Sequence, residues 1–111
     1  MGYDFHITRA DDWTKSREQP ITGADWLALI ASDPELEMST TDFYKRKVDD
    51  TIERIYATYW TAPNGEQTAV FWLADGRITV KYRDRIAMKK IVKIARKLSA
   101  RVQGDDGEEY A

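Results

Sequence analysis

The sequence predicts a single α+β domain over residues 1–111, with two or three helices packed on a largely antiparallel sheet. Three observations lead to this prediction. Apolar and polar residues alternate in several short segments, as they do in half-buried strands. Two longer segments repeat apolar residues about every 3.6 positions, as amphipathic helices do. An Asp-Gly pair between two apolar segments is typical of a tight hairpin.

Residues 3–9 (YDFHITR) alternate along their whole length. We expect a half-buried strand with its odd positions on the core and its even positions in solvent. The expected core residues are Tyr3, Phe5 and Ile7, and the expected solvent-facing residues are Asp4, His6 and Thr8.

A helix is predicted over residues 22–33. Thr22 is placed to cap its first turn, with Asp25 completing an imperfect capping box. Asp33 precedes Pro34 and should end the helix, because a residue before proline avoids helical geometry. The expected buried face consists of Trp26, Leu27 and Ile30.

The stretch 39–55 fits two structures. Tyr44, Val48, Ile52 and Ile55 have helical spacing, but the segment also contains many residues that favour strands. We expect a helix in its early part and a strand from about Ile55 to Thr61.

A hairpin is predicted next. Pro63-Asn64-Gly65 should form a turn, and residues 69–73 (AVFWL), apolar at every position, should form a central strand. Asp75-Gly76 favours a type I′ turn leading into the alternating segment RITVKY.

A second helix is predicted from about Asp84 to Ala100, followed by a short strand, ARVQ. Asp84 is a plausible N-cap, and the basic last turn suits the negative end of the helix dipole. The apolar stripe of this helix consists of Ala87, Ile91, Ile94, Ala95 and Leu98.

The charges are segregated along the chain. Residues 77–101 contain ten basic residues and one acidic residue, so the rest carries a net charge of −11 within a total of −2. Opposite charges on two surfaces govern partner choice and association rate. The plainer interpretation is that the second helix exposes a solvated basic face.

The composition excludes several kinds of chemistry and indicates where the protein resides. There is no cysteine, which excludes disulfides and thiolate chemistry, and no apolar run reaches the roughly 20 residues of a membrane span. The N-terminus lacks the basic and apolar regions of a signal peptide. We expect a cytoplasmic protein that does not associate with membranes.

The sequence predicts no catalytic or metal site and no cofactor. His6 is the only histidine, and Asp4 is its nearest carboxylate on the same strand face. GDDGEE (104–109) has the residue types of a calcium loop but neither its length nor a following helix. Gly104 and Gly107 instead favour tight turns that hold the neighbouring acids in a compact cluster, with Tyr110 docked on the fold.

Both ends of the chain resemble a family of small bacterial proteins. The segments that carry the resemblance are YDFHITRADDW, ADWLALIASDPEL, YWTAP, FWLADGRITVKY and IARKLSARVQGDDGEEY. They cover about two thirds of the sequence, and residues 37–55 fit least. The family is similar to the immunity proteins of contact-dependent growth inhibition and related polymorphic toxin systems.

This resemblance implies a non-enzymatic protein that binds and neutralises the C-terminal domain of a cognate toxin in the cytoplasm. Many such toxins are nucleases with basic clefts, towards which an acidic surface would steer. We expect the toxin-binding residues to be acids with two tryptophan anchors: Asp11, Asp12, Trp13, Glu35, Glu37, Trp60, Asp105, Asp106, Glu108 and Glu109.

Two other functions stay open. A small nucleic-acid-binding module would use the helix over 84–100, through Lys89, Lys93, Arg96 and Lys97, although no recognised nucleic-acid motif accompanies it. A hydrolase would use His6 with Asp4. The sequence favours toxin binding over both alternatives.

Overall fold

The computed structural model describes residues 4–82 and 85–111 and has the α+β fold that the sequence predicts. Seven strands form one antiparallel sheet in the order β2-β3-β4-β5-β1-β6-β7. The elements follow the chain as β1 (Phe5–Thr8), η1 (Trp13–Glu18), α1 (Gly23–Ser32), β2 (Leu36–Val48), β3 (Thr51–Thr61), β4 (Gln67–Ala74), β5 (Arg77–Tyr82), α2 (Arg85–Lys97), β6 (Arg101–Gly104) and β7 (Glu109–Tyr110).

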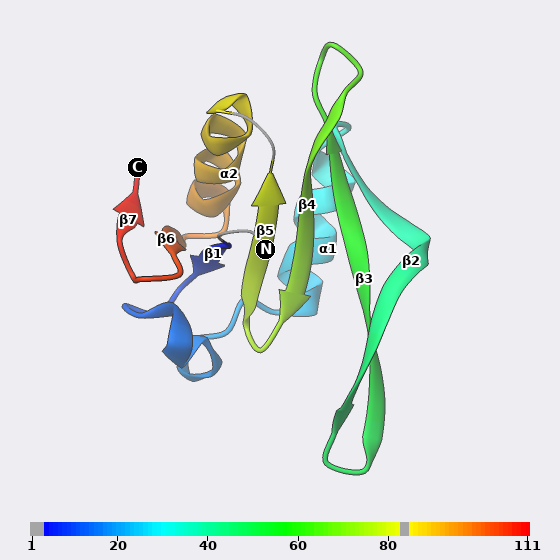
Figure 1. Ribbon diagram of the computed structural model, residues 1–111, viewed down its shortest axis with the longest axis vertical. Coiled ribbons are helices and arrows are strands. Elements are labelled where there is room, and N and C mark those ends of the chain that lie inside the picture. Colours follow the sequence, from blue (N-terminus) through cyan, green and yellow to red (C-terminus); the bar gives the residue numbers. More distant parts are fainter. Residues whose placement is uncertain (1–3, 83–84) are drawn as a thin grey trace.

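The two α-helices cover one face of the sheet, as Figure 1 shows. Between the helices and the sheet lies a continuous apolar core that includes Trp26 of α1, Phe71 of β4 and Ile91 of α2. The rings of Trp26 and Phe71 are 5.8 Å apart. Burial of each such side chain contributes on the order of 1.5–3 kcal/mol.

The short helix η1 covers part of the opposite face. Successive side chains of a strand point to opposite faces, so His6 and Thr8 lie on the far side of β1 from Phe5 and Ile7. There Trp13 stacks on His6 and Ser16 hydrogen-bonds to Thr8. The prediction that His6 and Thr8 face solvent is therefore wrong, because both faces of β1 are buried. Tyr3, the other predicted core residue, lies outside the described residues.

The helix predicted for the early part of 39–55 is also wrong. Residues Leu36–Val48 form β2, which pairs antiparallel with β3 over residues 36–38 and 43–48, with a shift of register between Met38 and Phe43. The two strands meet at Val48 and Thr51, leaving Asp49 and Asp50 as the turn. Asp49 adopts a φ of 55°, a conformation that Asp tolerates better than most residues. The strand predicted from Ile55 to Thr61 is confirmed within the longer β3.

Helix α1 starts and ends where the sequence predicts, with Thr22 as its N-cap and Asp33 as its C-cap. The Thr22 hydroxyl oxygen accepts a hydrogen bond from the Asp25 backbone N–H at 3.1 Å. The Asp25 carboxylate pairs with Arg9 instead of completing the capping box. Leu27, predicted to be buried, is 55% exposed, and Leu29 takes its place in the core.

The predicted turns are confirmed. Asp75 and Gly76 both have positive φ, 57° and 79°, as a type I′ turn requires. The Gly65 N–H donates to the Ala62 carbonyl at 2.8 Å, which closes the turn at 63–65. Strand β4 is an interior strand, in which Thr68, Ala69 and Phe71 are buried and Val70, Trp72 and Leu73 are half-buried.

The C-terminal region follows the prediction closely. The predicted apolar stripe of α2 is buried in the core, whereas the predicted N-cap, Asp84, lies outside the described residues. Residues 105–108 of GDDGEE form the turn between β6 and β7, with Gly107 at a φ of 86°, whereas Gly104 ends β6. The ring of Tyr110 packs 5.1 Å from that of Phe5, which confirms that the C-terminal aromatic docks on the fold.

Candidate protein-binding site

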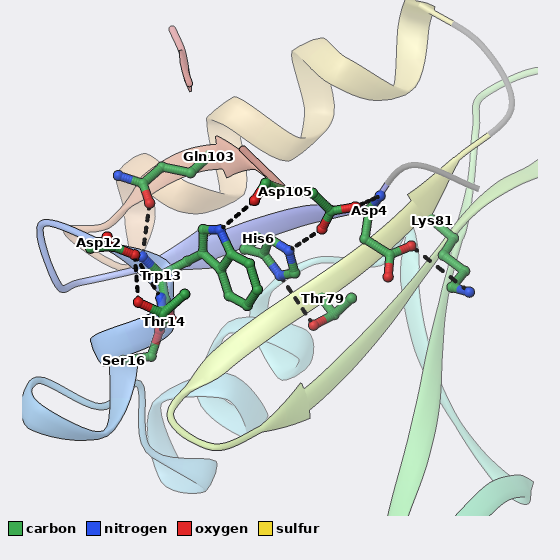
Figure 2. A network of polar contacts seen from close by, with 10 residues as sticks. All are labelled: Asp4, His6, Asp12, Trp13, Thr14, Ser16, Thr79, Lys81, Gln103 and Asp105. Carbon is green, nitrogen blue, oxygen red and sulfur yellow. Dashed lines mark hydrogen bonds and ion pairs between the residues drawn. The ribbon is translucent and has the colours of Figure 1, made fainter. Parts of the chain in front are cut away.

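The two ends of the chain meet around His6 (Figure 2). Strand β1 lies between β5 and β6, so the start of the chain is paired directly with its end. The His6 Nε2 atom lies 2.8 Å from Asp105 Oδ1, and the Asp4 backbone N–H donates to Asp105 Oδ2 at 3.0 Å. One carboxylate in the β6–β7 turn therefore holds both His6 of β1 and Asp4, the residue before this strand.

Trp13 closes this contact from the solvent side. Its ring stacks on His6 with centroids 3.9 Å apart, and its Nε1–H donates to the Asp105 carbonyl at 3.3 Å. The Arg77 guanidinium lies 5.0 Å from the Trp13 ring centre. Trp13 is thus part of the fold and only partly available as an apolar anchor.

Gln103 fixes η1 to β6. Its side chain is buried, accepts a hydrogen bond from the Trp13 backbone N–H at 2.8 Å, and donates one to the Asp11 carbonyl at 2.7 Å. Because both partners are backbone groups, this amide positions the loop before η1. The start of η1 is further held by Asp12, whose carboxylate accepts from the Thr14 N–H at 2.9 Å.

In this network the exposed Asp105 is ionised and the buried His6 is neutral. Burial lowers the pKa of His6 and outweighs the opposing hydrogen bond to Asp105. The Asp4 N–H, followed by His6, lowers the pKa of Asp105. A neutral His6 must donate through Nε2 to the ionised Asp105, so Nδ1 is left to accept from the Thr79 hydroxyl at 3.4 Å.

Six predicted acids gather on this side of the molecule, and all six are exposed: Asp11, Asp12, Asp105, Asp106, Glu108 and Glu109. We name this set the acidic rim. It combines the loop before η1 with the β6–β7 turn, two segments about ninety residues apart that Gln103 and Asp105 hold together. Arg101 lies within the rim and pairs with Asp11 at 3.3 Å and with Glu109 at 3.0 Å.

The other predicted site residues lie elsewhere. Trp60 is only 3% exposed, so its prediction as an apolar anchor is wrong. It belongs to the core and donates from Nε1 to Glu35 at 2.9 Å, and Glu35 also accepts from Lys90. Glu37 is exposed on β2, away from the rim. Strand β2 lies at the opposite edge of the sheet from β6 and β7, and local sequence patterns do not reveal that order.

His6 and Asp4 do not form the pair that a hydrolase was predicted to use. The carboxylate at His6 belongs to Asp105, while Asp4 lies 3.8 Å from Lys81. The His6 side chain is 4% exposed beneath Trp13. The partner of His6, 99 residues away, was not identified from the sequence, although the acidic turn that contains it was.

The basic residues of α2 form a separate surface. Lys89, Lys93, Arg96 and Lys97 are all exposed. Three of them line a groove of about 510 Å³ together with Met88, Val92 and Ala111. Lys90 differs from its neighbours, since its ammonium group is turned towards Asp33 and Glu35 and is nearly buried.

Comparisons with known proteins found no matching family model, curated protein or solved structure. In residues 4–82 and 85–111, no helix is long and apolar enough to cross a membrane. The same residues contain no group of three His, Asp or Glu side chains placed to bind a metal ion.

Proposed function

We propose that the protein is a cytoplasmic, non-enzymatic immunity protein that binds and neutralises a cognate bacterial toxin domain through the acidic rim. The observation that carries this proposal is the convergence of acids from both ends of the chain on one exposed surface. The resemblance of both ends to immunity proteins points to the same class of function. The partner expected from the charge of the rim is a basic protein surface, such as the cleft of a nuclease.

Rigidity supports the proposal. The acids are presented by the β6–β7 turn and by the loop before η1, which are tied to β1 and β6 through Asp105 and Gln103. Binding then requires little further ordering of the backbone, and such ordering is a substantial cost in flexible interfaces.

The acidic rim is expected to set the rate of association with the toxin. The variant Asp11→Asn/Asp106→Asn/Glu108→Gln should slow association about tenfold at low salt, because exposed charges act mainly on the encounter of the partners. Stopped-flow or surface plasmon resonance measurements with the cognate toxin domain would test this.

The matched control is Asp49→Asn/Asp50→Asn/Glu66→Gln, which removes the same charge from exposed positions outside the rim. Equal slowing in both variants would show that net charge, and not the rim, steers the partner. A growth test of coexpressed toxin addresses the function itself. Cells that die equally with and without this protein would refute the immunity role.

A second candidate function, nucleic-acid binding, is favoured by the groove beside α2. It would place phosphates against Lys89, Lys93 and Arg96. Fluorescence anisotropy with mixed RNA and DNA should then show binding at about micromolar concentration that weakens steeply with salt. The variant Lys93→Gln/Arg96→Gln should reduce both the affinity and the salt dependence, whereas Lys45→Gln/Lys47→Gln should not. Weak binding that is the same in all variants would exclude this alternative.

A further inference from the structure

The β2–β3 hairpin extends beyond the rest of the sheet (Figure 1). Its outer part runs from the pair Phe43 and Tyr56 to the turn at Asp49 and Asp50, and we name residues 43–56 the arm. Cross-strand partners share a face and successive residues alternate between faces. The arm therefore has two faces of different composition.

One face of the arm is basic and apolar. It consists of the pairs Phe43 with Tyr56, Lys45 with Arg54 and Lys47 with Ile52. We name it the basic arm face. All its charged residues are basic, and within the described residues none of the three has a carboxylate partner within ion-pair distance. Arg54 lies over the Phe43 ring, 4.9 Å from its centre, and Ile52 is 67% exposed.

On the opposite face of the arm, the basic residue is paired with carboxylates of the protein itself. Arg46 pairs with Glu53 across the strands at 2.9 Å and with Asp75 of the β4–β5 turn at 2.8 Å. These contacts tie the arm to the sheet, and they pair the carboxylates of Glu53 and Asp75 with Arg46. The positive charge of Lys45, Lys47 and Arg54 is left for a partner.

An apolar groove adjoins the basic arm face. One hollow, of about 190 Å³, lies between α1 and the arm and is lined by Leu27, Met38, Tyr56 and Leu73, among others. A second, of about 320 Å³, is lined by Met38, Ser39, Thr40 and Tyr56. Met38 and Tyr56 border both hollows, so the two adjoin each other, and we name them together the groove. Leu27 at its edge is more than half exposed.

We propose that the basic arm face and this groove bind an acidic polypeptide segment of a partner protein, with apolar side chains seated in the groove. The charge of the face selects an acidic partner. The hollows combine the apolar side chains of Leu27, Met38 and Leu73 with the hydroxyl groups of Ser39 and Thr40. This mixture suits the apolar side chains and polar backbone of a polypeptide. Nucleic-acid bases would stack on free aromatic faces, whereas Phe43 and Tyr56 pack on each other at 5.3 Å and Arg54 covers Phe43. This surface is distinct from the acidic rim and does not depend on the toxin.

Selection of displayed random peptides of about 12 residues on the full-length protein would test the proposal. The expected outcome is enrichment of peptides that combine Asp or Glu with Leu, Ile or aromatic residues. Synthetic peptides of the enriched sequence should bind at least about tenfold more weakly to Lys45→Gln/Arg54→Gln and to Leu27→Gln. All these substitutions are at exposed positions, so equal thermal midpoints would show that the fold is intact.

Lys89→Gln/Lys93→Gln is the matched control, because it removes the same charge from the basic surface of α2. Enriched peptides without acidic residues, or peptides that bind every variant equally, would overturn the proposal. Two further results would also overturn the proposal, because they would assign this surface to another kind of partner. One is single-stranded DNA that displaces the peptides, and the other is self-association in light scattering that Leu27→Gln abolishes.

Discussion

Replacement of Lys90 with Met is expected to lower the free energy of unfolding by about 3–5 kcal/mol, because it leaves the buried Asp33 carboxylate without its cation. Lys90 Nζ lies 2.7 Å from Asp33 Oδ2, and the two side chains are 10% and 6% exposed. Burial alone would raise the pKa of Asp33. The hydrogen bonds from Lys90 and from the Glu35 N–H outweigh burial, and the pKa is lowered. Urea unfolding at neutral pH would measure the effect.

The effect of Lys90→Met should depend on pH. A carboxyl group with a lowered pKa in the folded state contributes stability above its unfolded pKa, and this is lost as the pH falls through the folded value. In the variant burial raises the pKa of Asp33, which can then fold protonated at low cost. The difference from the wild type should therefore be largest at neutral pH and shrink below about pH 4.

Two variants serve as controls for Lys90. Lys89→Met removes an exposed charge from the same helix turn and should change stability by less than about 0.5 kcal/mol. Asp33→Asn keeps the oxygen that accepts the Glu35 N–H, so combining it with Lys90→Met should recover part of the loss. A double variant no more stable than Lys90→Met would show that the buried charge is not the cause.

Gly76→Ala is expected to destabilise the protein by about 2–5 kcal/mol, the sum of backbone strain and overpacking. Gly76 has a φ of +79°, and a Cβ there would lie 2.7 Å from the Ser16 carbonyl oxygen and 2.9 Å from Pro20 Cβ. Its own carbonyl accepts from the Ile21 N–H at 2.9 Å. The substitution would push η1 and its following loop away from the β4–β5 turn. Thermal and urea unfolding would measure the loss.

Gly65→Ala separates the two causes. Gly65 has a similar φ of +87°, but nothing lies within 4 Å of the position its Cβ would take. This variant should show only the conformational cost, about 1–2 kcal/mol. The difference between the two glycines then measures the steric contact with η1. Equal losses at both positions would show that η1 does not pack tightly on the turn.

The acidic rim and the basic arm face give the molecule two exposed surfaces of opposite charge. Each surface is held to the sheet by side chains that bind other parts of the protein. Asp105 and Gln103 hold the rim through hydrogen bonds, and Arg46 holds the arm through its ion pair with Asp75. Substitutions at these three residues would alter both folding and binding. The variants chosen for the binding tests therefore avoid them.

Six of the ten residues predicted from the sequence to bind a toxin lie together in the acidic rim, but the contacts that hold them there were not predictable. Asp11, Asp12 and the acids of the C-terminal turn were identified by charge alone, and the sheet brings them together. Asp105 was expected to face a partner, and it also holds His6 and Asp4. Nothing in the local pattern distinguishes Asp105 from Asp106, since the difference depends on which residue reaches β1.

Local patterns by themselves determined α1, α2 and the β4–β5 hairpin, because a cap, an apolar stripe or an Asp-Gly turn acts over a few residues. Only the tertiary structure decided the arm, the burial of His6 and the formation of the acidic rim. Helical spacing of Tyr44, Val48 and Ile52 did not exclude a hairpin, and Asp49-Asp50 is a weak turn signal. Pairing between β1 and β6 joins residues nearly a hundred positions apart, and such contacts depend on how the whole core packs.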